Sequence, residues 1–83
     1  MQKLSAVTVP DLGEDAEQVI TISARLVSPG DHVSVDDDIV EVVTDKAAFT
    51  MPSPIAGRVA RWKVSEGDEV KPGETILEME IEI

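Results

Sequence analysis

The feature that most limits how this chain can fold is an internal repeat, in which residues 26–46 align with residues 63–83 without a gap. Two copies are too few for a solenoid, which needs about three or more. We therefore expect two similar halves that pack face to face about a pseudo-two-fold axis, as a small sandwich or flattened barrel. The identical pairs, each 37 residues apart, are Val27 and Val64, Ser28 and Ser65, Gly30 and Gly67, Asp31 and Asp68, Val33 and Val70, Ile39 and Ile76, and Glu41 and Glu78.

A shorter similarity joins the start of each half. Thr-Val-Pro at residues 8–10 resembles Thr-Met-Pro at residues 50–52, which is 42 residues further on. Proline suits an edge strand because it cannot donate a hydrogen bond to a neighbouring strand. We therefore expect each half to open with an edge strand that ends in proline.

Strand patterns dominate the rest of the sequence, and no segment of ten residues or more has helical periodicity. In the last segment, strict alternation places Ile76 with the glutamates on one face and the apolar residues on the other, which is the expected core face. The expected strands are residues 19–23, 39–43, 57–64 and 75–83, and the expected core-facing residues of the last are Leu77, Met79, Ile81 and Ile83. The turns between strands contain glycine at residues 30, 67 and 73, and a positive φ is expected at Gly30 and Gly73, which follow proline. The sequence therefore predicts an all-β fold.

The composition fits one small domain and argues against several classes of function. The chain has 83 residues and a net charge of −10, which disfavours nucleic acid and anionic membranes as partners. It has no cysteine, so a disulfide, a thiolate metal site and a thiol nucleophile are excluded. No apolar stretch is long enough to span a membrane, and the first residues lack the apolar core of a signal peptide. We expect a cytosolic protein or a domain excised from a longer chain.

An Asp-Lys pair interrupts two apolar, strand-like segments within Glu-Val-Val-Thr-Asp-Lys-Ala-Ala-Phe-Thr-Met-Pro, residues 41–52. This pattern predicts a β-hairpin with Lys46 at its tip, where Asp45 can form the turn by bonding its own backbone. The repeat puts both chain ends at the equivalent place in the other half, so the hairpin should lie away from the termini. A lysine without a base, a cation or a pocket beside it is a poor catalyst. From local sequence, an ordinary turn lysine and an attachment point both remain open.

The sequence resembles the lipoyl domains of the acyltransferase (E2) components of 2-oxo acid dehydrogenase complexes. The resemblance implies a flattened β-barrel of two four-stranded antiparallel sheets, and a single lipoyl domain over residues 1–83. The motifs that carry it are VPDLGE (9–14), VSPGD (27–31), TDKAAFTMPSPIAGRV (44–59) and VSEGDEVKPGETILEME (64–80).

The resemblance also implies a function. Lysine at position 46 would carry lipoic acid through an amide bond, after attachment by a lipoate ligase or an octanoyltransferase. The arm would move acyl groups and electrons between the thiamin diphosphate-dependent E1, the acyltransferase core of the parent chain and the flavoprotein E3. The domain would be a carrier and not an enzyme. Thr44, Asp45 and Ala47 would form the recognition surface around Lys46.

The parent complex and some alternatives stay open. Many relatives have an acidic residue where this chain has Val43, so the sequence leaves the 2-oxo acid unassigned, with pyruvate placed first. Cytoplasmic location in a bacterium is preferred, or the mitochondrial matrix in a eukaryote. The alternatives are a free-standing lipoyl carrier, an unmodified lipoyl-like structural module, and a biotin carrier. The biotin reading fits poorly, because methionines flank the lysine in that family, whereas Asp45 and Ala47 do so here.

Other conspicuous residues are assigned structural roles. The acidic run Asp36–Asp38 lacks the glycine and distant glutamate of a calcium loop, so a solvated loop is expected. His32 lies in a turn, where no metal or catalytic role is expected. Gly57 should mark a close backbone approach within a strand. Trp62 and Met51 are expected in the core, with Trp62 partly exposed.

Overall fold

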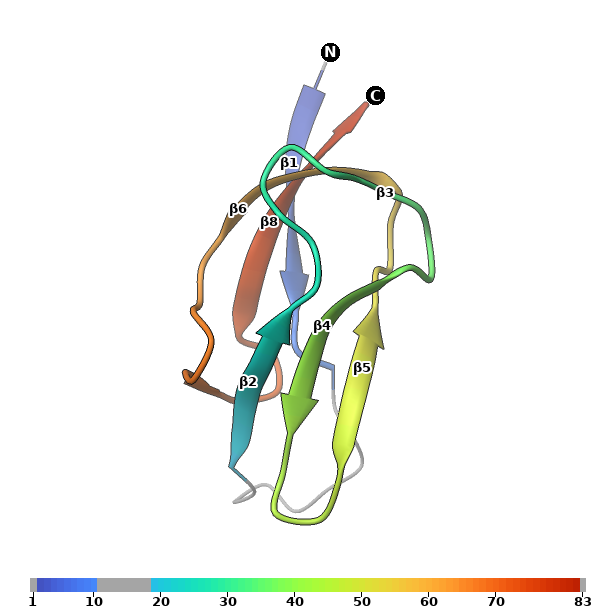
Figure 1. The fold of residues 1–83 in the computed structure, drawn as a ribbon. Helices are drawn as coiled ribbons and strands as arrows, with labels where there is room; N and C mark the ends of the chain where they lie inside the picture. Colours follow the sequence, from blue (N-terminus) through green and yellow to red (C-terminus); the bar gives the residue numbers. More distant parts are fainter. Residues whose placement is uncertain (1, 11–18, 83) are drawn as a thin grey trace.

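The described residues of the computed structural model, 2–10 and 19–82, form two antiparallel sheets of four strands each (Figure 1). The strand order is β1-β8-β6-β3 in one sheet and β5-β4-β2-β7 in the other. This confirms the all-β fold of two four-stranded sheets. The two halves do not pack face to face as expected, because each sheet takes two strands from each half. The strands are β1 (Gln2–Thr8), β2 (Ile20–Arg25), β3 (His32–Val33), β4 (Asp38–Val43), β5 (Ala48–Pro52), β6 (Gly57–Trp62), β7 (Glu69–Val70) and β8 (Thr75–Glu82).

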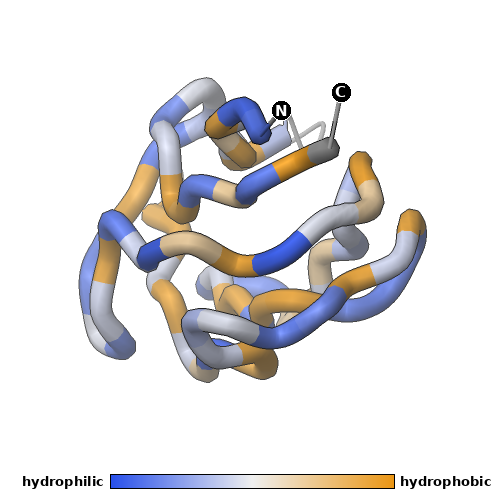
Figure 2. Tube along the Cα trace, turned by 90° about the horizontal axis from the view of Figure 1, so that it is seen from above, coloured by the Kyte–Doolittle hydropathy of each residue, from blue (hydrophilic) through white to orange (hydrophobic). Residues whose placement is uncertain are grey.

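One aliphatic core lies between the two sheets. Because successive residues of a strand point to opposite faces, hydrophobic and hydrophilic positions alternate along the strands of both layers (Figure 2). Met51 is buried and Trp62 is partly buried against the core, as expected, and Phe49 is also partly buried against it. The buried hydrophobic residues are Val7, Val9, Ile20, Ile22, Val33, Ile39, Val40, Val42, Met51, Val59, Val64, Val70, Ile76, Leu77 and Met79.

The repeat is reproduced in the hydrogen bonds of its turns. The N–H of Asp31 donates to the carbonyl of Ser28 at 3.0 Å, and the Ser28 N–H donates to an Asp31 carboxylate oxygen at 2.8 Å. Residues 65–68 make the same two bonds at the same two distances. Gly30 has a φ of 93°, which confirms the positive φ expected there, and its repeat partner Gly67 has a φ of 94°. Both halves therefore use one kind of turn, closed by backbone and aspartate together.

The 42-residue offset predicted from the similarity of residues 8–10 to residues 50–52 is two residues too short. Val7 pairs with Leu77 on β8, and Met51 pairs with Val40 on β4. Val40 and Leu77 are partners in the 37-residue repeat, so Met51 is the structural equivalent of Val7, 44 residues further on. The two strands do begin the two halves at the sheet edges, as expected, but β1 ends at Thr8 and not at proline.

The strict alternation expected for the last strand is also broken. The alternation predicts that Ile76 points away from the core, yet its side chain is fully buried. Thr8 pairs with Thr75 and Val7 with Leu77, so Ile76 is the extra residue of a β-bulge. A bulge interrupts the two-residue period and lets neighbouring residues point the same way. Leu77 and Met79 face the core as expected and Ile81 is partly buried, while Ile83 lies outside the described residues.

The hairpin between β4 and β5 lies at the end of the molecule opposite the two termini (Figure 1). β1 and β8 run side by side toward the chain ends, while β4 and β5 meet at the other end. The molecule measures 41 × 20 × 19 Å along its principal axes, so this separation follows its long dimension. The position predicted from the repeat is confirmed.

Gly57, at the start of β6, is the close approach expected from the sequence. A Cβ atom placed on it would lie 2.5 Å from the backbone carbonyl oxygen of Glu80 on β8. That oxygen belongs to a paired strand and cannot move away alone. At Gly30, by contrast, a Cβ would meet nothing within 4 Å, and only the positive φ opposes a side chain.

We predict that Gly57→Ala lowers the free energy of unfolding by about 3 kcal/mol, because the methyl group must displace β8. Gly30→Ala is the matched control and should cost about 1–2 kcal/mol, through left-handed backbone strain alone. Urea denaturation of both variants measures the difference. A Gly57→Ala variant as stable as Gly30→Ala would contradict the close approach.

An ion pair also joins the two central strands of this sheet. Arg61 on β6 and Glu78 on β8 are register partners, and the Arg61 Nε–H donates to a Glu78 carboxylate oxygen. This hydrogen bond, together with the positive charges of Arg61 and Lys63, lowers the pKa of Glu78, against a smaller opposing effect of burial. A carboxyl whose pKa is lower in the folded state stabilises the fold above its unfolded pKa. That contribution is lost as the pH falls through the folded pKa.

We predict that Arg61→Gln raises the pKa of Glu78 toward its ordinary value, as measured by an NMR titration of the side-chain carboxyl carbon. The stability difference between the native protein and the variant should be largest above about pH 4.3, the ordinary pKa of glutamate, and should shrink at lower pH. Arg58→Gln is the control, because Arg58 bonds His32 at 3.1 Å. An equal Glu78 pKa in all three proteins would contradict the assignment.

Candidate functional site

The hairpin that presents Lys46 is anchored by its strands. Val42 pairs with Phe49 and Val43 with Ala48, so the paired strands extend directly to the turn of residues 44–47. Val42 is fully buried and Phe49 is partly buried against the core. Because both strands are fixed by core side chains, the four residues beyond them, 44–47, are held at a defined end of the molecule.

The turn itself is organised by Thr44. Its N–H donates to the carbonyl of Ala47 at 2.8 Å. Its hydroxyl oxygen accepts from the N–H groups of Lys46 and Ala47, both at 3.2 Å, and the hydroxyl donates to the Ala47 carbonyl at 3.3 Å. The sequence predicts a turn-forming role for Asp45 and a recognition role for Thr44, and these bonds add a turn-closing role for Thr44. The available signal was the threonine itself, because its hydroxyl can bond backbone groups two and three residues on.

The residues expected around the attachment point are brought together at this turn. Asp45, Lys46 and Ala47 are exposed, and Thr44 is partly buried. Val43 is also partly buried, and its neighbours in the ladder are Thr21 on β2 and Ala48 on β5. The geometry offers an accessible primary amine on a short, hydrogen-bonded turn. Such an amine suits covalent attachment better than acid–base catalysis, which needs a pocket.

The acidic run Asp36–Asp38 and His32, which the sequence also singles out, lie outside the turn of residues 44–47. Asp37 accepts from the N–H of Ser34 at 2.9 Å within a turn, and Asp38 begins β4. His32 bonds Arg58 across β3 and β6. Within residues 2–10 and 19–82, no group of three or more histidine, cysteine or acidic side chains could hold a metal ion. Over the same residues, no helix could cross a bilayer.

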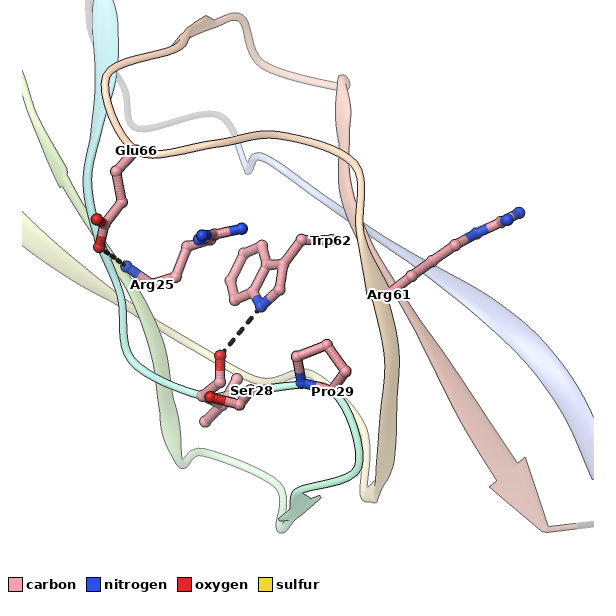
Figure 3. Close-up of a pocket in the computed structure, with 7 residues that line it drawn as sticks. Arg25, Ser28, Pro29, Arg61, Trp62 and Glu66 are labelled. Carbon is pink, nitrogen blue, oxygen red and sulfur yellow. Dashed lines mark hydrogen bonds between the residues drawn. The ribbon is translucent and has the colours of Figure 1, made fainter.

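A groove beside Trp62 is the second place where a ligand could be sought (Figure 3). The indole N–H donates to the carbonyl of Val27 at 3.0 Å, and the Arg25 guanidinium lies 5.8 Å from the ring centroid. The Arg25 N–H donates to Glu66 at 3.0 Å, and the Arg61 side chain points away from the groove. These polar groups bond one another and join the end of β2 to the loop after β6. The groove therefore has a structural role, and the hairpin remains the candidate site.

Comparisons with known proteins agree with this choice. The family model described as "Biotin-requiring enzyme" matches residues 5–79. The chain is 42% identical over 76 residues to the dihydrolipoyllysine-residue acetyltransferase component of the pyruvate dehydrogenase complex of Pseudomonas aeruginosa, covering 92% of this chain and 13% of that protein. It is 39% identical over 79 residues to the lipoamide acyltransferase component of the branched-chain alpha-keto acid dehydrogenase complex of Bacillus subtilis, covering 95% and 18%. The chain thus spans less than a fifth of the length of these relatives.

A solved structure shares the fold. The solution structure of the lipoyl domain of the 2-oxoglutarate dehydrogenase complex from Azotobacter vinelandii matches with a TM-score of 0.68 and 25% sequence identity. The match covers 89% of this chain and 95% of that one. The two-sheet architecture is therefore that of a complete domain in the neighbour.

Proposed function

The chain belongs to the family of biotin- and lipoyl-carrying domains, and from this premise we propose that it is a lipoyl carrier whose cofactor is amide-linked to Lys46. The observation that carries the proposal is the exposure of Lys46 on the hairpin tip, at the end of the domain opposite both termini. A longer chain attached at either terminus would leave this lysine facing outward. The residues present fit the group, because an exposed amine is what amide formation with a free carboxylic acid requires.

The position of Lys46 distinguishes it from the other lysines. Lys3 lies on β1 near the chain ends, Lys63 follows β6, and Lys71 lies in the turn before β8. Lipoic acid, when bound, supplies a dithiolane that accepts acyl groups and electrons. A carrier must bring such a group to several active sites, and tethering keeps its effective concentration high there. A lysine far from the tether reaches furthest, so Lys46 is the residue that we assign.

The family includes biotin carriers, and two observations favour lipoic acid. Asp45 and Ala47 flank the lysine, as the resemblance to lipoyl domains requires. The relatives at 38–42% identity include acetyltransferase and lipoamide acyltransferase components of dehydrogenase complexes. We therefore propose that Thr44, Asp45 and Ala47 surround a lipoylation site and that the domain itself performs no catalysis.

We further propose that the parent chain is an acyltransferase of a pyruvate dehydrogenase complex, because several relatives come from such complexes. The partners would be a lipoate ligase or octanoyltransferase, E1, E3 and the acyltransferase core. The proposal treats residues 1–83 as one lipoyl domain. These relatives are bacterial, which supports the bacterial cytoplasm as its location. A free-standing carrier is an alternative to a domain of a longer chain, and an unmodified structural module is the alternative that the following test separates from a carrier.

We predict that the protein made with a lipoate-attaching enzyme and lipoate gains one lipoyl group, detected by intact mass and mapped to Lys46 by peptide sequencing. Lys46→Arg should gain none, because arginine offers no amine for the amide bond. Lys71→Arg is the matched control, since Lys71 also lies in an exposed turn, and it should be modified like the native protein.

An unmodified native protein beside a modified reference domain would reject the carrier function and favour the structural module. Capture by avidin after co-expression with a biotin ligase would instead favour the biotin carrier.

A further inference from the structure

We propose that Thr44 is the positioning residue of the attachment site, and that its hydroxyl holds the turn on which an attaching enzyme meets Lys46. This inference rests on the proposed function, and it assigns Thr44 a different role from recognition.

The backbone closes this turn around two tip residues. Thr44 and Ala47 are joined by a backbone hydrogen bond, so only Asp45 and Lys46 lie between them. Hairpin loops of two residues favour turns with positive φ at one or both positions, and glycine or asparagine usually occupies them. Among the described non-glycine residues, Asp36 alone has a positive φ. The two tip residues therefore stay in the ordinary negative-φ region, and the usual twist-matched turn is not formed.

The Thr44 hydroxyl supplies the acceptor that closes this turn. The N–H of Ala47, which would bond the residue 44 carbonyl in a regular two-residue hairpin, donates to the hydroxyl oxygen. The N–H of Lys46 donates to the same oxygen, also at 3.2 Å. A single side chain thus fixes the peptide groups on both sides of the Lys46 Cα atom.

The bonding capacity of this hydroxyl is fully used inside the turn. A threonine hydroxyl has one donor and two acceptor lone pairs. Here the hydrogen points to the Ala47 carbonyl and the two lone pairs face the two N–H groups. A partner enzyme could bond this hydroxyl only by displacing one of these interactions. Its role is therefore to shape the turn, and direct recognition falls to the exposed residues beside it.

The internal repeat does not explain Thr44. Its counterpart 37 residues later is Ile81, which lies within β8 in a region of regular pairing with β1. The other half of the domain thus needs no hydroxyl at this place, because it has no turn there. Thr44 is tied to the hairpin that presents Lys46 and not to the scaffold that both halves share.

A kinetic consequence follows from this role. If the hydroxyl is removed, the turn samples other conformations and only a fraction of the molecules present Lys46 correctly. An enzyme that binds the correct conformation then shows a weaker apparent affinity by that fraction. Loss of the hydroxyl should therefore raise the KM for the domain and leave kcat nearly unchanged.

The test compares Thr44→Val, Thr44→Ser and Thr50→Val in the full 83-residue chain. Valine keeps the shape of threonine without the hydroxyl, and serine keeps the hydroxyl. Thr50 is an exposed threonine on β5 of the same hairpin, so its valine variant controls for loss of a hydroxyl nearby. Amide exchange of Lys46 and Ala47 is measured by NMR on the unmodified chain, and KM and kcat are measured with a lipoate-attaching enzyme.

We expect Thr44→Val to exchange both amides up to about fivefold faster, which corresponds to one net hydrogen bond, and to raise KM by the smaller factor by which the correctly closed fraction falls. Thr44→Ser should restore most of both values, and Thr50→Val should match the native chain. Native values in Thr44→Val would overturn the inference. A raised KM with unchanged amide exchange would also overturn it, because the enzyme would then read the hydroxyl directly. Faster exchange with an unchanged KM would reject the effect on attachment.

Failure of the proposed function is a separate result. The native chain would then accept no lipoate, while the amide exchange of Thr44→Val would still show whether its hydroxyl holds the turn. Native exchange in that variant would overturn the positioning role whatever the outcome of the attachment assay.

Discussion

Ile39 and Ile76 are completely buried between the two sheets, and each is the extra residue of a bulge at the same place in its half. A small domain buries a limited share of its surface, so each core position counts. The bulges let two consecutive residues of a strand enter the core, which a regular strand would not allow. Burial of this aliphatic layer joins the halves, and the positions of the hairpin and of the chain ends depend on it.

The proposed site at the hairpin tip is supported by this rigid core but lies outside it. Val42 and Phe49 tie the hairpin strands to the core, and the residues beyond them project from the end of the molecule. The core therefore supplies a fixed base, and Thr44 supplies local order at the tip. The lysine side chain is left exposed, as a tethered carrier needs. Stability and function are thus separated along the long axis of the domain.

The charges follow a similar division. The net charge of −10 keeps the surface acidic, while the polar contacts near Trp62 and the pair of Arg61 with Glu78 fasten loops and strands on the outer faces. These contacts lie on scaffold elements and not at the hairpin tip. An acidic domain of this kind attracts basic partner surfaces, and the hairpin end of the domain, opposite the termini, is exposed to them.

Much of the fold could be predicted from the sequence because it depends on local patterns that occur twice. The 37-residue repeat, the four long strands, the positive φ of Gly30, and the location of Lys46 away from the termini all follow from turn chemistry and alternation. The two-residue strands β3 and β7 were not predicted, because they are too short to show a period.

Other features were decided only by the tertiary structure. The inward position of Ile76 and the 44-residue relation between β1 and β5 depend on which residues of distant strands pair, and register is a property of the partners together. The bonding of Thr44 depends on a turn whose ends are set by the same ladder. Local turn chemistry along the chain is enough to predict that a hairpin presents Lys46. The pairing of strands far apart in the chain decided how that hairpin is closed, because hydrogen-bond partners are chosen in space and not along the sequence.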